Sequence, residues 1–279
     1  MPSKAVLITG CSSGIGHATA ERLAAEGWTV YATARRPASI ADLEERGCKT
    51  LALDVTDEAS MSAAVSAVSA AEGAVGVLVN NAGYSQSGAV ESVPLDQVRR
   101  QFETNVFGLL RMSQLVLPGM REQHWGKIVN IGSMGGKLTF PGGGVYHATK
   151  YAVEALSDAL RFEVRGFGVD VVLVEPGLIV TGFGDAATAT VQPDAGGAYA
   201  HFNEHVAKLT TAAYQGPMAK LGAGPDAVAK TIARALKAGR PRPRYPVTIS
   251  ARLMINQRRL TPDRVWDLIM RTQFPTPHA

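Results

Sequence analysis

The chain has 279 residues, of which 46% are hydrophobic and 19% are charged, and its net charge is +4. This composition excludes a disordered chain, and the length suits one α/β domain with a sizeable core. A mild positive charge is a weak signal for nucleic acid, so we expect no nucleic-acid partner.

The two cysteines, Cys11 and Cys48, have neither metal-binding nor redox spacing. We therefore expect no disulfide and no metal site. The N-terminus lacks the pattern of a secretory leader, and no run of 18 apolar residues is present. These features predict a cytoplasmic protein without stable membrane insertion.

Short apolar runs alternate with helical patterns over the first 180 residues. The runs lack polar alternation, which is typical of strands buried on both faces of a parallel sheet. The expected strands are Ala5–Thr9, Thr29–Thr33, Thr50–Leu53, Val75–Val79, Lys127–Ile131 and Val169–Val174. The expected helices are Gly14–Gly27, Pro37–Arg46, Ala59–Glu72, Pro94–Leu110, Leu110–Glu122 and Val145–Phe167, the fourth and fifth able to join as one bent rod. The fold class predicted is α/β, a Rossmann-like doubly wound parallel sheet flanked by helices.

The residue composition changes after Gly182. Residues 184–224 are rich in Ala, Thr and Gly, with a weak helical pattern at Ala198–Ala213. A long excursion of this kind suits a lid over a substrate. A helix at Pro225–Ala238, a last strand at Arg244–Ile249 and a helix at Thr261–Arg271 should follow, the last with Thr261 as its cap and Pro262 at its first position. Without repeats or a long linker, residues 1–279 are expected to form one domain.

A glycine-rich turn follows the first strand and precedes a helix. Glycines allow a tight turn and close approach to a pyrophosphate, which the free N–H groups of the helix N-terminus can bind. The residues expected to contact a dinucleotide here are Gly10, Ser12, Ser13, Gly14, Ile15 and Gly16. The same turn also fits G-x-S-x-G, the nucleophile elbow of serine hydrolases, with Ser12 as nucleophile. Only one strand precedes it, which disfavours that alternative.

The second strand ends in Ala34-Arg35-Arg36, where NAD-binding folds usually carry an acidic residue. An arginine suits the 2′-phosphate of NADP, so Arg35 favours NADP(H) over NAD(H). A solvated arginine pair is the alternative interpretation. Asp54, followed by Val55 after the third strand, is placed to bond the adenine amino group, although it could equally be a turn aspartate.

Four further residues form a candidate catalytic set. Tyr146 and Lys150 are four apart, so they share one face of a helix. Ser133 ends the preceding strand, and Asn105 lies on an earlier helix. Each alone has an ordinary structural interpretation, but their joint order favours a catalytic one.

With these motifs, residues 4–183 resemble the classical short-chain dehydrogenase/reductase family. The resemblance rests on the 9–16 turn, Asn80-Asn81-Ala82-Gly83, Asn105, Ser133, Tyr146-x-x-x-Lys150 and Pro176-Gly177. It implies hydride transfer between a nicotinamide and an alcohol/ketone pair, and cofactor contacts from Asn81, Ala82, Gly83, Tyr146, Lys150, Pro176, Gly177 and Thr181. The residues of the first turn and of Tyr31–Arg35 are similar to those of 17β-hydroxysteroid and retinol dehydrogenases. Homodimers or homotetramers are implied too.

The resemblance also assigns roles to the catalytic set. A free tyrosine has a pKa near 10, so Lys150 and the oxidised cofactor should lower the pKa of Tyr146 for acid–base work. Ser133 would hold the substrate oxygen, and Asn105 would anchor a water that links Lys150 to solvent. A non-catalytic NADP sensor with the same fold is the alternative, which would have no need of this set.

Substrate choice should depend on residues 84–90, 135–144 and 184–224. These stretches carry few charges, which favours an apolar alcohol or ketone such as a steroid, a retinoid or a fatty acyl derivative. The expected pocket walls are Phe140, Val145, Phe183, Phe202, Tyr214 and Met218. Eight arginines follow Arg240 inclusive, interleaved with prolines and apolar residues, which favours a solvated edge over a surface for acidic partners or a membrane.

Overall fold

The computed structural model describes residues 1–191, 197–216 and 222–277. Met218, one of the expected pocket walls, lies outside them. In the described residues one sheet holds seven parallel strands in the order β3-β2-β1-β4-β5-β6-β7. The strands are β1 (Val6–Ile8), β2 (Val30–Ala34), β3 (Lys49–Ala52), β4 (Val77–Asn80), β5 (Gly126–Ile131), β6 (Val169–Glu175) and β7 (Arg244–Pro246). The predicted Rossmann-like fold class is confirmed, since this is the doubly wound strand order with one added strand.

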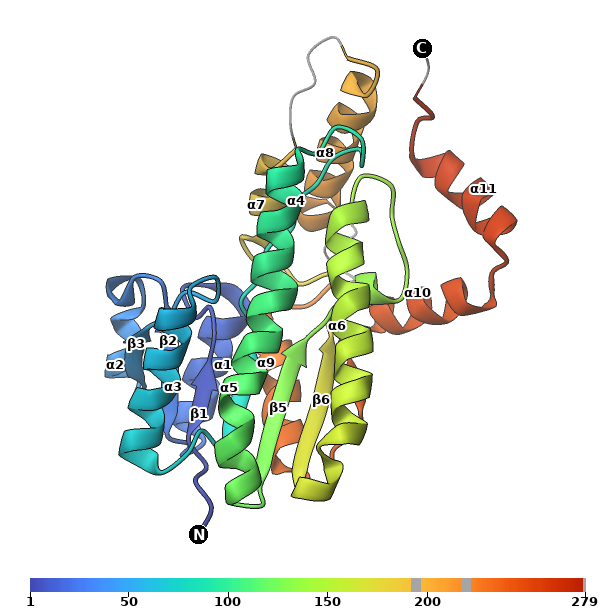
Figure 1. Ribbon diagram of the computed structural model, residues 1–279. Coiled ribbons are helices and arrows are strands. Elements are labelled where there is room, and N and C mark those ends of the chain that lie inside the picture. The colour runs from blue at the N-terminus through green and yellow to red at the C-terminus, as the bar shows by residue number, and fades with distance from the viewer. Residues whose placement is uncertain (192–196, 217–221, 278–279) are drawn as a thin grey trace.

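Helices cover both faces of the sheet (Figure 1). They are α1 (Gly14–Ala25), α2 (Asp42–Glu45), α3 (Glu58–Glu72), α4 (Leu95–Phe102), α5 (Gly108–Glu122), α6 (Gly144–Glu163), α7 (Phe183–Ala189), α8 (Ala200–Gln215), α9 (Pro225–Lys237), α10 (Ile249–Leu260) and α11 (Asp263–Gln273). On β1, Val6 and Ile8 pack with α1 and α9, whereas Leu7 packs with α3 and α5. Both faces of the strand are fully buried, which explains its unbroken apolar sequence.

The expected bent rod is present. Helices α4 and α5 join through a π-helical turn at Glu103–Phe107, and Figure 1 shows them as one long rod. Gly108 lets this rod approach the loop after β3, because a Cβ at Gly108 would lie 2.5 Å from the carbonyl oxygen of Val55. The π turn carries Asn105.

The C-terminal third differs most from the sequence-based expectation. The predicted strand 244–249 ends at Pro246, and an unpredicted helix, α10, begins at Ile249. Thr248 caps it, because its hydroxyl oxygen accepts a hydrogen bond from Ala251 N at 3.0 Å. The cap predicted at Thr261 is wrong: Thr261 ends α10, its hydroxyl donates to Gln257 O at 2.7 Å, and Pro262 takes the N-cap position of α11.

The carboxyl ends of the strands point to the top of Figure 1, and α7 and α8 stand above that edge. Helix α7 was not predicted, whereas α8 lies where the weak pattern at 198–213 placed a helix. Within the described parts of the chain, no helix combines the length and the apolar character needed to cross a membrane.

Candidate active site

The glycine-rich turn between β1 and α1 is packed too closely for side chains. Gly10 has a φ of 72°, and a Cβ there would lie 2.9 Å from the Ala82 Cα atom. A Cβ at Gly16 would overlap the carbonyl oxygen of Gly10. Ser13 is the N-cap of α1, but its side chain makes no capping hydrogen bond. The turn is therefore a backbone cradle at a helix N-terminus, which fits a pyrophosphate.

The turn after β4 is bound to this cradle by side chains. Asn81 Nδ2 donates to the carbonyl oxygens of Thr9 (2.9 Å) and Gly10 (2.8 Å). The Thr9 hydroxyl oxygen accepts from the backbone N–H groups of Asn81 and Ala82, both at 3.0 Å. Thr181 lies against the cradle as well, with its Cγ2 3.5 Å from where a Gly14 Cβ would be. The structure thus brings together predicted cofactor residues from three separate segments.

The residue that directly follows β2 is Arg35. Arg35 is exposed and forms no hydrogen bond or ion pair with the residues that the structure describes. Asp54 is engaged in a turn, since its Oδ1 accepts from Thr56 N at 2.9 Å and from the Thr56 hydroxyl at 2.8 Å. An adenine contact would have to come from its other carboxylate oxygen.

Tyr146 stands on the first turn of α6, facing Ser133 at the end of β5. The Ser133 hydroxyl is close enough to favour the ionised form of Tyr146. The Ser133 oxygen also accepts from Gly135 N at 3.0 Å, which fixes the serine side chain. Burial raises the pKa of Tyr146 to about 12, and this outweighs the opposite effect of the Ser133 hydroxyl. In the chain alone the pKa of Tyr146 is therefore raised, whereas the sequence led us to expect a lowered pKa.

Lys150 lies near the Tyr146 ring, and no hydrogen bond joins the two side chains in the described part of the chain. Its ammonium is 5.7 Å from the ring centroid and donates to the carbonyl oxygen of Ile131 at 2.8 Å. Burial lowers the pKa of Lys150 to about 8. Burial therefore sets the direction of the Tyr146 pKa in the chain alone, despite the nearby cation.

The Asn105 side chain is held between Tyr84 and Thr149 of α6. Its Oδ1 accepts from Tyr84 N at 3.1 Å, and its Nδ2 donates to Tyr84 O at 2.9 Å and to the Thr149 hydroxyl at 3.1 Å. A Cβ at Gly83 would lie 3.0 Å from Asn105 Oδ1. Its carboxamide therefore fixes the segment that leads from the β4 turn to the substrate side.

Pro176 and Gly177 follow β6 at the same edge. The Pro176 carbonyl accepts from Met134 N at 2.9 Å, one residue beyond Ser133. A Cβ at Gly177 would overlap the Thr248 hydroxyl. The predicted residues Ser133, Tyr146, Lys150, Pro176 and Gly177 are thus brought to one place.

His147 is a site neighbour that the sequence did not single out. Its Nδ1 donates to Gly135 O (2.9 Å) and its Nε2 accepts from Phe140 N (3.2 Å). Burial lowers its pKa, in keeping with a neutral ring, and the ring centroid is 5.7 Å from that of Tyr146. Its place between Tyr146 and Lys150 in the sequence was the available signal. It holds the 135–144 loop against α6.

The three stretches expected to select substrate meet above Tyr146. Phe183 of α7 lies with its ring centroid 5.8 Å from that of Tyr146. The Thr190 hydroxyl donates to Ser85 O at 3.1 Å and accepts from Ser87 N at 3.0 Å. Asn203 of α8 accepts from Ala89 N at 2.9 Å, which joins α8 to the same stretch.

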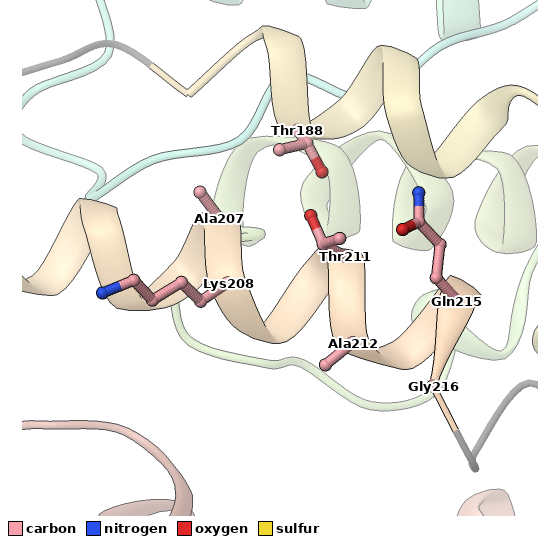
Figure 2. Close-up of a pocket in the computed structure, with 7 residues that line it drawn as sticks. All are labelled: Thr188, Ala207, Lys208, Thr211, Ala212, Gln215 and Gly216. Carbon is pink, nitrogen blue, oxygen red and sulfur yellow. The ribbon is translucent and has the colours of Figure 1, made fainter.

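A cavity of about 530 Å³ lies between α7 and α8, away from this centre. Figure 2 shows Thr188 and Thr211 facing each other across it, with Gln215 beside them. None of the predicted catalytic or cofactor residues lines this cavity. Ser12, the hydrolase nucleophile of the alternative interpretation, forms no hydrogen bond with a described histidine or acidic residue, so that alternative has no geometric support.

Comparison with known proteins identifies the family. The family profile described as short chain dehydrogenase matches residues 4–192. This chain is a short-chain dehydrogenase/reductase. It is 43% identical over 186 residues to 3-ketodihydrosphingosine reductase of Bacteroides thetaiotaomicron, covering 66% of this chain and 67% of that protein. It is 35% identical to NADPH-dependent 3-dehydrocapnine reductase of Ornithobacterium rhinotracheale, covering 94% of each chain.

Solved structures agree with this placement. A short-chain dehydrogenase from Streptomyces avermitilis has 33% identity and a TM-score of 0.77, covering 97% of this chain and 98% of its own. A serine dehydrogenase complexed with NADP+ has 28% identity and a TM-score of 0.76, covering 88% and 95%. A family member from Burkholderia phymatum in complex with NAD has 26% identity and a TM-score of 0.79, covering 100% and 98%. The chain is therefore an oxidoreductase with a nicotinamide-binding fold.

Proposed function

We propose that this enzyme uses NADPH to reduce the ketone of a long-chain, largely apolar substrate. The observation that carries the proposal is the half-buried pair of hydroxyls, Ser133 and Tyr146, with the Phe183 ring 5.8 Å from the Tyr146 ring. The two reductases named above act on 3-keto compounds by name, which supports a ketone substrate. Of the substrate classes that the sequence leaves open, the fatty acyl type agrees best with these relatives.

The catalytic roles follow from the geometry. A ketone oxygen between Ser133 and Tyr146 would accept hydrogen bonds from both hydroxyls, which polarises the carbonyl. With a pKa of about 12, Tyr146 holds its proton at neutral pH and can donate it to the developing alkoxide. Lys150, with a pKa near 8, lies near the ring as the nearest exchangeable proton store.

The cradle residues fit a nicotinamide dinucleotide, which when bound supplies the hydride. The backbone of the 10–16 turn would hold the pyrophosphate, with Asn81–Gly83 and Thr181 beside it. The free guanidinium of Arg35 would pair with a 2′-phosphate, which is why NADPH is favoured over NADH. Asn105 would hold the nearby water expected for proton exchange.

The test is reduction of long-chain 3-ketones in detergent, followed by the absorbance of reduced nicotinamide. We expect turnover with NADPH at least tenfold above that with NADH, and a loss of this preference in Arg35→Ser. Arg121→Ser, on α5, is the matched control. A steroid ketone and retinal test the subgroup that the sequence suggested. Turnover of these alone, or a preference for NADH in the wild type, would overturn the proposal.

Three further expectations belong with it. We propose that the chain acts in the cytoplasm as one domain. We also propose a homodimer or homotetramer formed through the α4–α5 rod and α6. Exposed aromatic side chains on these elements support such an interface, since Phe107 is 51% and Phe162 83% exposed. Size-exclusion chromatography with light scattering tests it.

A further inference from the structure

Helix α10 carries apolar side chains on two opposite sides. One side packs inward: Ala251 is buried, and Met254 and Ile255 pack against the cluster around Leu138. On the other side Ile249, Leu253 and Leu260 are 75%, 64% and 82% exposed. Their spacing of four and seven residues places them on one outer stripe. Packing onto the protein core explains only the inner side.

Helix α11 repeats this arrangement. Trp266 and Met270 are buried, whereas Val265 and Leu268 are 47% and 60% exposed. Arg258 joins the two helices, because it pairs with Asp263 at 2.5 Å and its guanidinium lies 5.5 Å from the Trp266 ring centroid. Figure 1 shows α10 and α11 to the outer side of α6, away from the sheet.

Positive charge is concentrated on the same two helices. Residues 249–273 hold five arginines and two aspartates, so they carry +3 of the chain's net +4. The exposed arginines Arg252, Arg259, Arg264 and Arg271 form no ion pair with the residues that the structure describes. Exposed apolar stripes beside unpaired arginines match the requirements of an anionic lipid surface.

A groove of about 490 Å³ lies between α11, the 139–144 loop and the start of α6. Six of its lining residues are Val90, Phe140, Tyr151, Trp266, Met270 and Arg271. The Phe140 ring is 6.4 Å from Trp266 and 5.9 Å from His147, which in turn is 5.7 Å from Tyr146. Two aromatic contacts, from Phe140 to His147 and from His147 to Tyr146, thus link the groove to the Tyr146 ring.

We propose that α10 and α11 form a docking face for anionic bilayers and that a long-chain ketone reaches Tyr146 from the lipid along this groove. The second part rests on the proposed function. A second copy of the chain is a poorer occupant, because a symmetric contact would place the arginines of both copies together. The bilayer supplies the opposite charge and an apolar layer at once.

The test is flotation of the full chain with vesicles of phosphatidylglycerol and phosphatidylcholine, compared with vesicles of phosphatidylcholine alone, without substrate or cofactor. We expect at least tenfold stronger binding to the anionic vesicles at low salt, and loss of that difference at high salt. Removing two exposed arginines, Arg252→Gln with Arg259→Gln, should weaken binding about 25-fold at about fivefold each. Leu253→Ser with Leu260→Ser should weaken it at least tenfold.

Lys230→Gln on α9 and Phe167→Ser, beyond the end of α6, are the matched controls, since both side chains are exposed and lie off these helices. They should float like the wild type. Turnover of a short water-soluble ketone should be unchanged in both α10 double variants, which shows that they fold. Wild-type protein that stays in solution, variants that still float, or α10 variants that only lose a dimer would each overturn the docking face. Failure to reduce long-chain ketones in detergent would instead count against the proposed function, with flotation unaffected.

Discussion

The cofactor side and the substrate side of the candidate active site are held by different kinds of contact. On the cofactor side, Gly10 and Gly16 meet backbone atoms where no Cβ fits, and Asn81 bonds directly to backbone carbonyls. On the substrate side, α7 and α8 are joined to residues 84–90 mainly through two side chains, Thr190 and Asn203. The cofactor side therefore tolerates almost no substitution. On the substrate side, single side chains can be replaced one at a time. One fold can therefore keep its cofactor and vary its substrate.

The largest effect is expected where the two sides meet, at Tyr146. Tyr146→Phe removes the proton donor but keeps the ring, so kcat should fall about 1000-fold while NADPH affinity changes little. Stopped-flow turnover and fluorescence titration measure the two quantities. Tyr31→Phe on β2, whose hydroxyl donates to Glu72 at 2.8 Å, is the control and should leave both unchanged. A Tyr146→Phe enzyme with a tenth of wild-type turnover would remove Tyr146 from its proposed role.

Gly16→Ala tests the rigidity of the cofactor side. The new methyl group would overlap the Gly10 carbonyl, so we expect at least about tenfold weaker NADPH binding and a stability loss of about 1–3 kcal/mol. Gly166→Ala is the control, because no atom lies within 4 Å of a Cβ there. Titration and chemical denaturation give both values. Equal behaviour of the two variants would show that the cradle can relax.

Asn203→Ala tests the looser substrate side. It leaves the buried Ala89 N–H without its acceptor and Ser92 Oγ without its Asn203 donor. We expect KM for a long-chain ketone to rise about three- to tenfold, with NADPH affinity kept. Asn256→Ala on the exposed side of α10 is the control. A loss of NADPH binding in Asn203→Ala would contradict the separation of the two sides.

The smallest effect is expected at Glu175, a buried acidic residue at the end of β6. Glu175, next to Pro176, lies against Glu154 and 3.7 Å from Arg244. Burial and the neighbouring carboxylate raise its pKa from 4.5 to about 7. Between these two values the folded protein holds a proton that the unfolded chain has lost, so stability falls as pH rises through this window.

Glu175→Gln keeps the hydrogen-bond donor and removes the titration. We therefore expect the variant to lose less Tm than the wild type between pH 5 and pH 8, by at least about 3 °C. Thermal melts across this range check it, with the exposed Glu163→Gln as the control. Parallel curves for wild type and Glu175→Gln would show that the pair does not carry this pH dependence.

The sequence predicted the sheet and the proximity of Ser133, Tyr146 and Lys150, and the reasons are local. Strands such as β1 are buried on both faces, so an apolar run of Val6–Ile8 identifies them. The site residues lie at strand ends or on one helix face, so their order along the chain predicts their meeting. Their roles in catalysis and cofactor binding stay predictions until the variants above are measured.

Two features could not be predicted in this way. The helical period of α10 is hidden because Leu253 and Leu260 add an outer apolar stripe to the inner one at Met254 and Ile255. The pKa of Tyr146 depends on burial, which the four-residue spacing to Lys150 does not reveal. In both cases the outcome depends on tertiary packing, which the spacing of residues along the chain does not reveal.

The π turn at Glu103–Phe107 has a consequence for engineering. Each residue of a regular helix rotates the next by about 100°, so a one-residue deletion before this turn would restore an ordinary rod. Helices α4 and α5 would stay in phase, because a π turn accommodates one extra residue, but the bulge that carries Asn105 would be lost. The carboxamide of Asn105 would then lose its paired bonds to Tyr84. A designer who straightened this rod would have to rebuild the 84–90 segment in the same step.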